Sequence, residues 1–136
     1  MLSMAIPLSN LLQFLLHFGV VIVIVGVFAL LWLKATPFDD IALIRAGNTA
    51  AAVAFAGTLV GFAIPVAGVV RASTTIGEVL PWSAIALIAQ LLGLWLATRV
   101  LHGLVKPIQH GEVASGVFVA GIAITIGILN AACMGG

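Results

Sequence analysis

The chain has 136 residues, of which 63% are hydrophobic and only 7% are charged, with a formal net charge of +1. Soluble domains carry about 25% charged residues, so this chain has too few polar side chains to cover a globule in water. The nearly neutral balance gives no basis for nucleic acid as a partner, and a single cysteine, Cys133, excludes an internal disulfide.

The charged residues leave four uncharged stretches, at 1–33, 46–70, 79–98 and 113–136. Each can hold the roughly 20 apolar residues that an α-helix needs to cross about 30 Å of hydrocarbon. None alternates polar and apolar residues as the strands of a membrane barrel do. The first stretch is too long for a signal-peptide core, and no Lys or Arg precedes residue 34. We therefore expect an all-α membrane protein whose four transmembrane helices lie near 11–33, 48–70, 80–98 and 113–133.

The loops indicate how the helices are oriented in a bacterial-type inner membrane. Cytoplasmic loops collect Lys and Arg. Loop 34–45 carries Lys34 and Arg45, and loop 99–112 carries Arg99 and Lys106, whereas loop 71–78 carries only Arg71. The pattern predicts that loops 34–45 and 99–112 are cytoplasmic and that both termini lie outside, in the periplasm.

An internal repeat relates the two halves of the chain at an offset of 64 residues. Eight aligned pairs are identical: Ile44/Ile108, Gly47/Gly111, Ala50/Ala114, Val53/Val117, Ala56/Ala120, Gly57/Gly121, Ile64/Ile128 and Ala67/Ala131. We interpret residues 1–75 and 76–136 as duplicated two-helix units that insert the same way up, related by an axis along the membrane normal. Asn48 and Glu112 hold corresponding places and are expected to cap the second and fourth helices.

Small residues concentrate in the second and fourth helices. Gly57 and Gly61 form a Gly-x-x-x-Gly pair, and Gly116 and Gly121 lie in the fourth helix. Lipid tails are as apolar as Leu, so close backbone approach over small residues is what joins helices in a bilayer. We expect these two helices to pack together at the centre, with the first and third outside. The contact could lie within one chain or between copies.

No Asp, Glu, Lys or Arg falls inside a predicted span, which counts against a proton pump or charge-coupled transporter. Milder polar residues remain in or near the spans: Gln13, His17, Thr58, Gln90, Thr125, Asn130 and Cys133. They could converge on a polar cavity. The favoured alternative is that each makes one interhelical hydrogen bond, worth about 0.6 kcal/mol on average.

The cytoplasmic loops hold further polar residues, namely Asp39, Asp40, His102, His110 and Glu112. Their spacing matches no recognised metal-ligand pattern, and solvated loops explain them equally well. The sequence also has no phosphate-binding loop or nucleophile elbow. We expect no metal, no cofactor and no enzymatic activity.

Several segments resemble a known family. They are Ala46–Ala52, Gly57–Gly61 with Ile64 and Pro65, and Asn130–Met134, together with Thr36-Pro37 and Ile85–Leu91. The chain resembles the YjfL-type small bacterial inner-membrane proteins, which are built from a tandem domain of unknown function 350. The resemblance covers nearly the whole chain. It implies location and topology, and it carries no activity or catalytic residue.

Two function hypotheses follow. The first is a non-enzymatic scaffold or accessory subunit that acts through helix packing in the lipid bilayer, with other copies of itself or with a partner membrane protein. The alternative is a small homo-oligomeric pore or transporter, lined by residues such as Thr58, Gln90 and Thr125.

Overall fold

The computed structural model describes residues 7–36 and 38–134, and this part of the chain consists of helices joined by short turns and loops. Its elements are α1 (Leu8–Ala35), α2 (Asp40–Arg45), α3 (Thr49–Ala72), α4 (Ile76–Val100), α5 (His102–Val105), the 3-10 helix η1 (Lys106–His110) and α6 (Val113–Cys133). Residues 1–6, which begin the first proposed repeat, and residues 135–136, which end the second, lie outside the described residues.

The four long helices α1, α3, α4 and α6 are long and apolar enough to cross a membrane. The prediction of an all-α membrane protein with four transmembrane helices is therefore confirmed. The spans α3 and α6 begin within a residue of their predicted starts. Helices α1 and α4 begin earlier than expected, at Leu8 and Ile76. Pro81 is the sixth residue of α4, and the helix continues through it although the proline leaves the Gly77 carbonyl without its usual helical donor.

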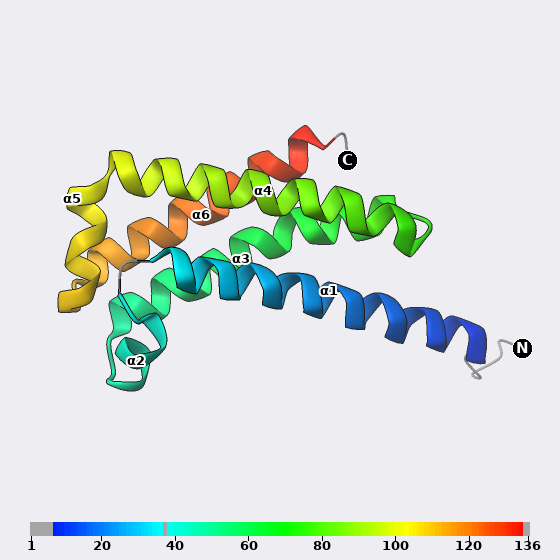
Figure 1. The fold of residues 1–136 in the computed structure, drawn as a ribbon, viewed down its shortest axis with the longest axis horizontal. Coiled ribbons are helices and arrows are strands. Elements are labelled where there is room, and N and C mark those ends of the chain that lie inside the picture. The colour runs from blue at the N-terminus through cyan, green and yellow to red at the C-terminus, as the bar shows by residue number, and fades with distance from the viewer. Residues whose placement is uncertain (1–6, 37, 135–136) are drawn as a thin grey trace, which may run out of the picture.

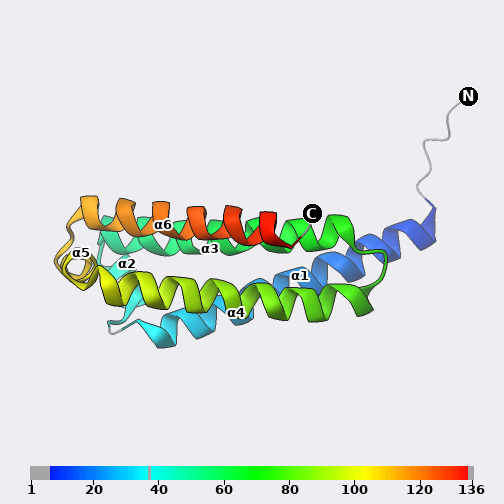
Figure 2. The ribbon, with the colours of Figure 1, turned by 90° about the horizontal axis from the view of Figure 1, so that it is seen from above.

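The long helices form two layers (Figure 2), with α3 and α6 side by side in one and α1 and α4 in the other. The short elements α2 and α5 lie together at one end of the bundle, which we call the loop end (Figure 1). The turn between α3 and α4 and the end of α6 lie toward the opposite end, which we call the outer end. Helices α3 and α6 both run from the loop end to the outer end, so their contact is parallel.

Helices α3 and α4 each contact the three other long helices, and α3 is the most buried of the four. Helix α6 contacts α3 and α4 and leaves its other face open. The expected packing of the second helix against the fourth is present as the contact between α3 and α6. The expectation that the third helix lies outside this pair is wrong, because α4 contacts α1 as well as α3 and α6. A two-layer arrangement of four helices leaves each layer one outward face, and α6 has no third neighbour to cover it.

Helix α1 is attached to the bundle only by its second half. Phe28 and Trp32 are its buried residues, and Phe28 stacks on Phe62 of α3 with ring centroids 4.3 Å apart. The first half of α1 diverges from the other helices (Figures 1 and 2). Its large apolar side chains, such as Phe14 and Phe18, are exposed. In a bilayer these side chains face lipid or another protein.

Matching turns lead into α3 and α6. Gly47 donates its amide to Ile44 O at 3.0 Å, and Gly111 donates to Ile108 O at the same distance. The next residue in each turn donates back to the residue before that acceptor, which completes a Schellman turn in both places. Both glycines have positive φ, +89° and +82°. The duplication stays a prediction, and two identical turns 64 residues apart favour it.

The residues after these glycines differ in what they do. Asn48 caps α3, because its Oδ1 accepts from the Ala51 amide, as predicted. Its Nδ2 also donates across to Ile108 O at 2.9 Å, so it ties one half of the chain to the other. Glu112 makes no side-chain capping bond to α6, so the prediction that it caps through its side chain is wrong. A carboxylate has no N–H with which to reproduce the second bond of Asn48.

We predict that Gly47→Ala destabilises the protein by about 1 kcal/mol, because a residue with a Cβ atom is strained by about that amount in the left-handed backbone conformation. The free energy of unfolding in detergent measures the effect. Gly103→Ala is the control, since Gly103 has no positive φ and an added methyl there meets nothing within 4 Å. Equal stability of the two variants would contradict the proposed role of the turn.

Candidate functional site

The two backbones of α3 and α6 touch along a seam of glycines. A methyl group added to Gly57 would lie 2.5 Å from Cα of Ala120, and one added to Gly116 would lie 2.8 Å from Cα of Ala50. One added to Gly61 would lie 2.6 Å from the carbonyl carbon of Ala123. Real Cβ atoms essentially never approach other atoms this closely. These positions can therefore hold only glycine without a shift of one helix.

Gly127 completes the seam near its outer end and was not anticipated. Its backbone lies against the Gly61 carbonyl group, and an added methyl would overlap it. Pro65 follows Gly61 by four residues and has no N–H, so the Gly61 carbonyl lacks the usual helical donor. Contacts between Cα–H groups and carbonyl oxygens recur where helices touch this closely. The Gly127 backbone thus covers an acceptor that Pro65 leaves free.

Gly121 does not lie in the seam, although the repeat aligns it with Gly57. It is exposed, and an added methyl would meet nothing within 4 Å. Six residues separate Gly121 from Gly127, which is about 240° around a helix. The two glycines therefore lie on different faces, and only Gly127 faces α3. The repeat aligns Gly121 with Gly57 in sequence. In the structure, however, α3 and α6 contact each other through faces that do not correspond in the repeat alignment.

Gln90 and Asn130 join α4 to α6 by hydrogen bonds. Gln90 is fully buried, and its Nε2 donates to Ala123 O at 3.0 Å. A methyl group on Gly61 would lie 3.1 Å from that nitrogen, so the glycine also leaves room for Gln90. Asn130 Nδ2 donates to Ala86 O of α4 at 3.1 Å. On the same face of α4, Gln90 Oε1 and Ser83 Oγ are buried with no hydrogen-bond partner among the described residues.

The remaining polar residues do not join this group. Thr58 is buried and Thr125 is exposed, and each donates to the carbonyl four residues earlier in its own helix. His17 bonds to Gln13 O within α1, in the half that leaves the bundle. Cys133 is exposed near the end of α6. The seven residues therefore do not converge on one cavity, and only Gln90 and Asn130 make interhelical bonds.

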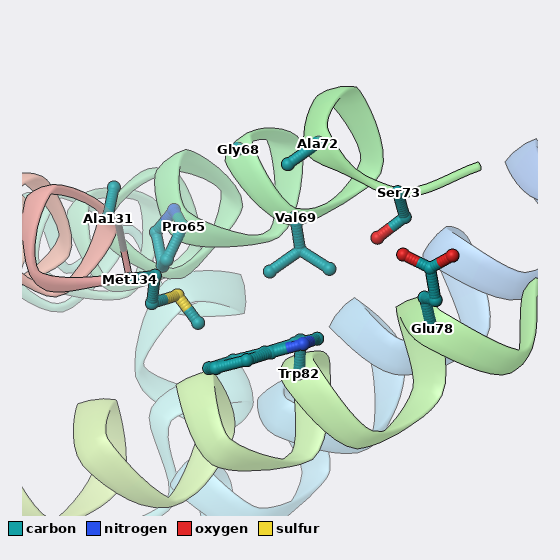
Figure 3. Close-up of a pocket in the computed structure, with 9 residues that line it drawn as sticks. All are labelled: Pro65, Gly68, Val69, Ala72, Ser73, Glu78, Trp82, Ala131 and Met134. Carbon is teal, nitrogen blue, oxygen red and sulfur yellow. The ribbon is translucent and has the colours of Figure 1, made fainter. Parts of the chain in front are cut away.

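A crevice of about 170 Å³ opens at the outer end between α3, α4 and the end of α6. Figure 3 shows Val69 pointing toward the ring of Trp82, with Met134 beside that ring. Ser73 and Glu78 face each other at the other side of the crevice (Figure 3). Glu78 accepts a hydrogen bond from Thr74 at 2.8 Å. The lining is mostly apolar with one carboxylate at its rim, so it offers a contact surface for an amphipathic group.

Asp40 was expected in a solvated loop, and that expectation is wrong. Only 5% of its surface is exposed, and Thr36 Oγ1 donates to its Oδ2 at 2.6 Å. Burial raises the pKa of the Asp40 carboxyl group above 3.8, the nearby Asp39 charge raises it further, and the Thr36 bond opposes both. The adjacent Asp39 does what a loop acid commonly does, since its side chain accepts from Ala42 N and caps α2. Sequence position could not tell these neighbours apart.

We predict that Gly57→Ala lowers the thermal stability of the protein in detergent, by an overpacking cost of about 1–3 kcal/mol. Gly121→Ala is the matched control, because it adds the same methyl to an aligned helical glycine with open space around it. That control should be neutral or slightly stabilising, since Ala favours helix over Gly. Equal melting temperatures for the two variants would show that α3 and α6 do not touch at Gly57.

A second prediction concerns pH. Because the pKa of Asp40 is raised in the folded protein, the favourable contribution of this group to the free energy of unfolding is fully present below about pH 3.8. That contribution is lost as pH rises through the pKa of the folded protein. Asp40→Asn should remove this loss, so the variant should be more stable than wild type at neutral pH and equal to it in acid. Thermal unfolding in lipid-free detergent across this range measures it. Asp39→Asn is the control; a stability loss for Asp40→Asn at neutral pH would contradict the account.

Comparisons with known proteins agree with this architecture. The model of the Domain of Unknown Function (DUF350) family matches residues 5–134. The chain is 35% identical over 127 residues to the UPF0719 inner membrane protein YjfL of Escherichia coli K12, covering 93% of this chain and 96% of that protein. The protein of the same name from Escherichia coli O157:H7 matches equally. No solved structure matches the chain. The chain therefore belongs to the DUF350 family of membrane proteins.

Proposed function

We propose that this multi-pass inner-membrane protein is a non-enzymatic scaffold or accessory subunit, which acts by packing its helices against another copy or a partner membrane protein. The inner-membrane location agrees with that of its relatives, which are named as inner membrane proteins. The carrying observation is a glycine face on α1 that nothing in the described part of the chain covers. Methyl groups added to Gly19 or Gly26 would meet nothing within 4 Å.

The position of these glycines on α1 supports a docking role. They are seven residues apart and so lie on one face, and Phe28 follows Gly26 by about 200° of helix rotation. The glycine face is thus turned away from the bundle that Phe28 packs against. A glycine inside a helix destabilises that helix by about 1 kcal/mol relative to alanine, and contact with lipid does not offset this loss. A neighbouring helix that packs closely over the glycine does offset it, because the two backbones then make van der Waals contact.

The alternative of a small homo-oligomeric pore drew on Thr58, Gln90 and Thr125. Thr58 of α3 and Gln90 of α4 are buried, whereas Thr125 is exposed on α6. The three residues do not share a surface that could line one passage. The contact between the α3 and α6 backbones also fills the middle of the bundle with protein. The scaffold proposal therefore draws on more of the structure than the pore does.

We predict that the double change Gly19→Leu and Gly26→Leu lowers self-association in nanodiscs or capture of a cross-linked membrane partner in cells. The reason is that two large side chains would hold the neighbouring helix away. The melting temperature should not fall below the wild-type value, because an added methyl at either glycine meets nothing within 4 Å and leucine favours helix over glycine. Single-molecule photobleaching and in-cell cross-linking measure the two forms of association.

Val27→Leu is the matched control, at an exposed position of α1 about a quarter turn from Gly26. It should leave both forms of association unchanged. Wild-type association in the glycine double variant would contradict the proposed docking face. Solute or ion flux through liposomes that contain purified wild-type protein would favour the pore.

The orientation of the chain yields a further prediction. In a Cys133→Ala background, a membrane-impermeant thiol reagent should label Thr74→Cys in intact spheroplasts, because Thr74 is exposed in the turn at the outer end. It should not label Gln109→Cys, which is exposed at the loop end. The opposite labelling pattern would place the loop end outside and would overturn the prediction from the Lys and Arg distribution.

A further inference from the structure

A small pocket at the loop end encloses Asp40. It has a volume of about 50 Å³, more than the ~10–15 Å³ that one water needs. Four aromatic side chains from α1, the following loop, α3 and α4 line it: Trp32, Phe38, Phe55 and Trp95. Ala35, Ala54, Ile108 and Val119 supply the aliphatic part of the wall. Thr36 and Thr98 supply hydroxyl groups. The pocket thus places a buried carboxylate beside aromatic side chains.

The charge of Asp40 is not neutralised by its described neighbours. The side chains that act on it are Thr36, which donates a hydrogen bond, and Asp39, which is itself acidic. A buried carboxylate is costly unless a positive charge pairs with it. Aromatic faces attract cations through their quadrupole, and the attraction grows where water is excluded. The chemistry of the pocket therefore matches an organic cation, and its small volume suits a primary ammonium group.

The pocket adjoins a surface that lipid can reach. Trp32, Ala35 and Trp95 line both the pocket and an open groove of about 420 Å³ between α1 and α4. The rest of the groove is aliphatic: Leu31, Ile88, Leu91 and Leu92. Both helices are membrane spans, and Leu31, Ile88 and Leu92 of the groove are exposed. The groove thus lies in the part of the bundle that faces the acyl chains.

A positive charge stands beside this groove. The Arg99 guanidinium lies over the ring of Trp95, 5.0 Å from its centroid, and the Arg99 side chain is exposed. A carboxylate inside the pocket and a guanidinium outside it form a pair of opposite charges. A zwitterionic phospholipid headgroup carries the complementary pair, an ammonium group and a phosphate.

We propose that the pocket and groove bind one aminophospholipid, with its ammonium group on Asp40, its phosphate beside Arg99 and an acyl chain between α1 and α4. A soluble amine could supply the same ammonium group. The continuous apolar groove favours the lipid, because a soluble amine would leave the groove unused. This inference is independent of the proposed scaffold function, since the pocket is separate from the glycine face of α1.

Native mass spectrometry tests the proposal. Full-length protein is released from nanodiscs that contain phosphatidylethanolamine and phosphatidylglycerol in equal amounts with the same acyl chains. Wild type should retain phosphatidylethanolamine in preference. Asp40→Asn should reduce that preference about tenfold, the loss expected for one charge-assisted hydrogen bond. Trp95→Leu, at a half-exposed position, should also reduce it.

Asp39→Asn is the matched control, because it removes an adjacent acidic charge that is exposed and keeps a side chain able to cap α2. It should bind lipid as wild type does. No preference in wild type, or an unchanged preference in both Asp40→Asn and Trp95→Leu, would overturn the proposal. Free ethanolamine at millimolar concentration should not displace the lipid. Displacement, or ethanolamine binding that Asp40→Asn abolishes in lipid-free detergent, would assign the site to a soluble amine instead.

Discussion

The contact between the backbones of α3 and α6 is the constraint on which the rest of the structure depends. Four glycines, Gly57, Gly61, Gly116 and Gly127, let the two helices approach until backbone atoms touch. Within lipid no hydrophobic force holds helices together, so the dispersion contacts of this seam and a few hydrogen bonds must do so. Helices this close bury little side-chain volume, which explains why the protein can be small and still have a defined centre.

The positions of the other helices follow from the seam. Gln90 of α4 reaches Ala123 O because Gly61 has no side chain in its way, and Asn130 of α6 returns a bond to α4. Helix α1 has no comparable polar bond to the bundle in the part of the chain that the structure describes. It is held by the stacking of Phe28 on Phe62 and by Trp32. This difference accounts for a firmly docked α4 and an α1 whose first half is free to meet lipid or another protein.

The sequence predicted the fold class and the helix positions well, because uncharged runs of this length have few structures open to them in lipid. The Gly-x-x-x-Gly pair in α3 and the cap at Asn48 were also readable from local pattern. The partner face of α6 was predicted only in part, since Gly116 lies in the seam as expected and Gly121 does not. Gly121 and Gly127 are equally glycine in the sequence, and only the crossing of the helices decides which one meets α3. The burial of Asp40 depends likewise on how α2 folds back, since Asp39 beside it is exposed.

The most direct test of the seam is a distance between the two backbones in a bilayer. Solid-state NMR of protein labelled with a mixture of carbonyl-13C and Cα-13C glycine can detect carbon pairs within a few ångströms. A Gly136→Ala background removes the signal of the chain neighbours Gly135 and Gly136. The account predicts a short-range cross-peak between the Gly61 carbonyl and Gly127 Cα, which the structure places against each other. Its absence in a well-folded sample would show that α3 and α6 do not meet backbone to backbone.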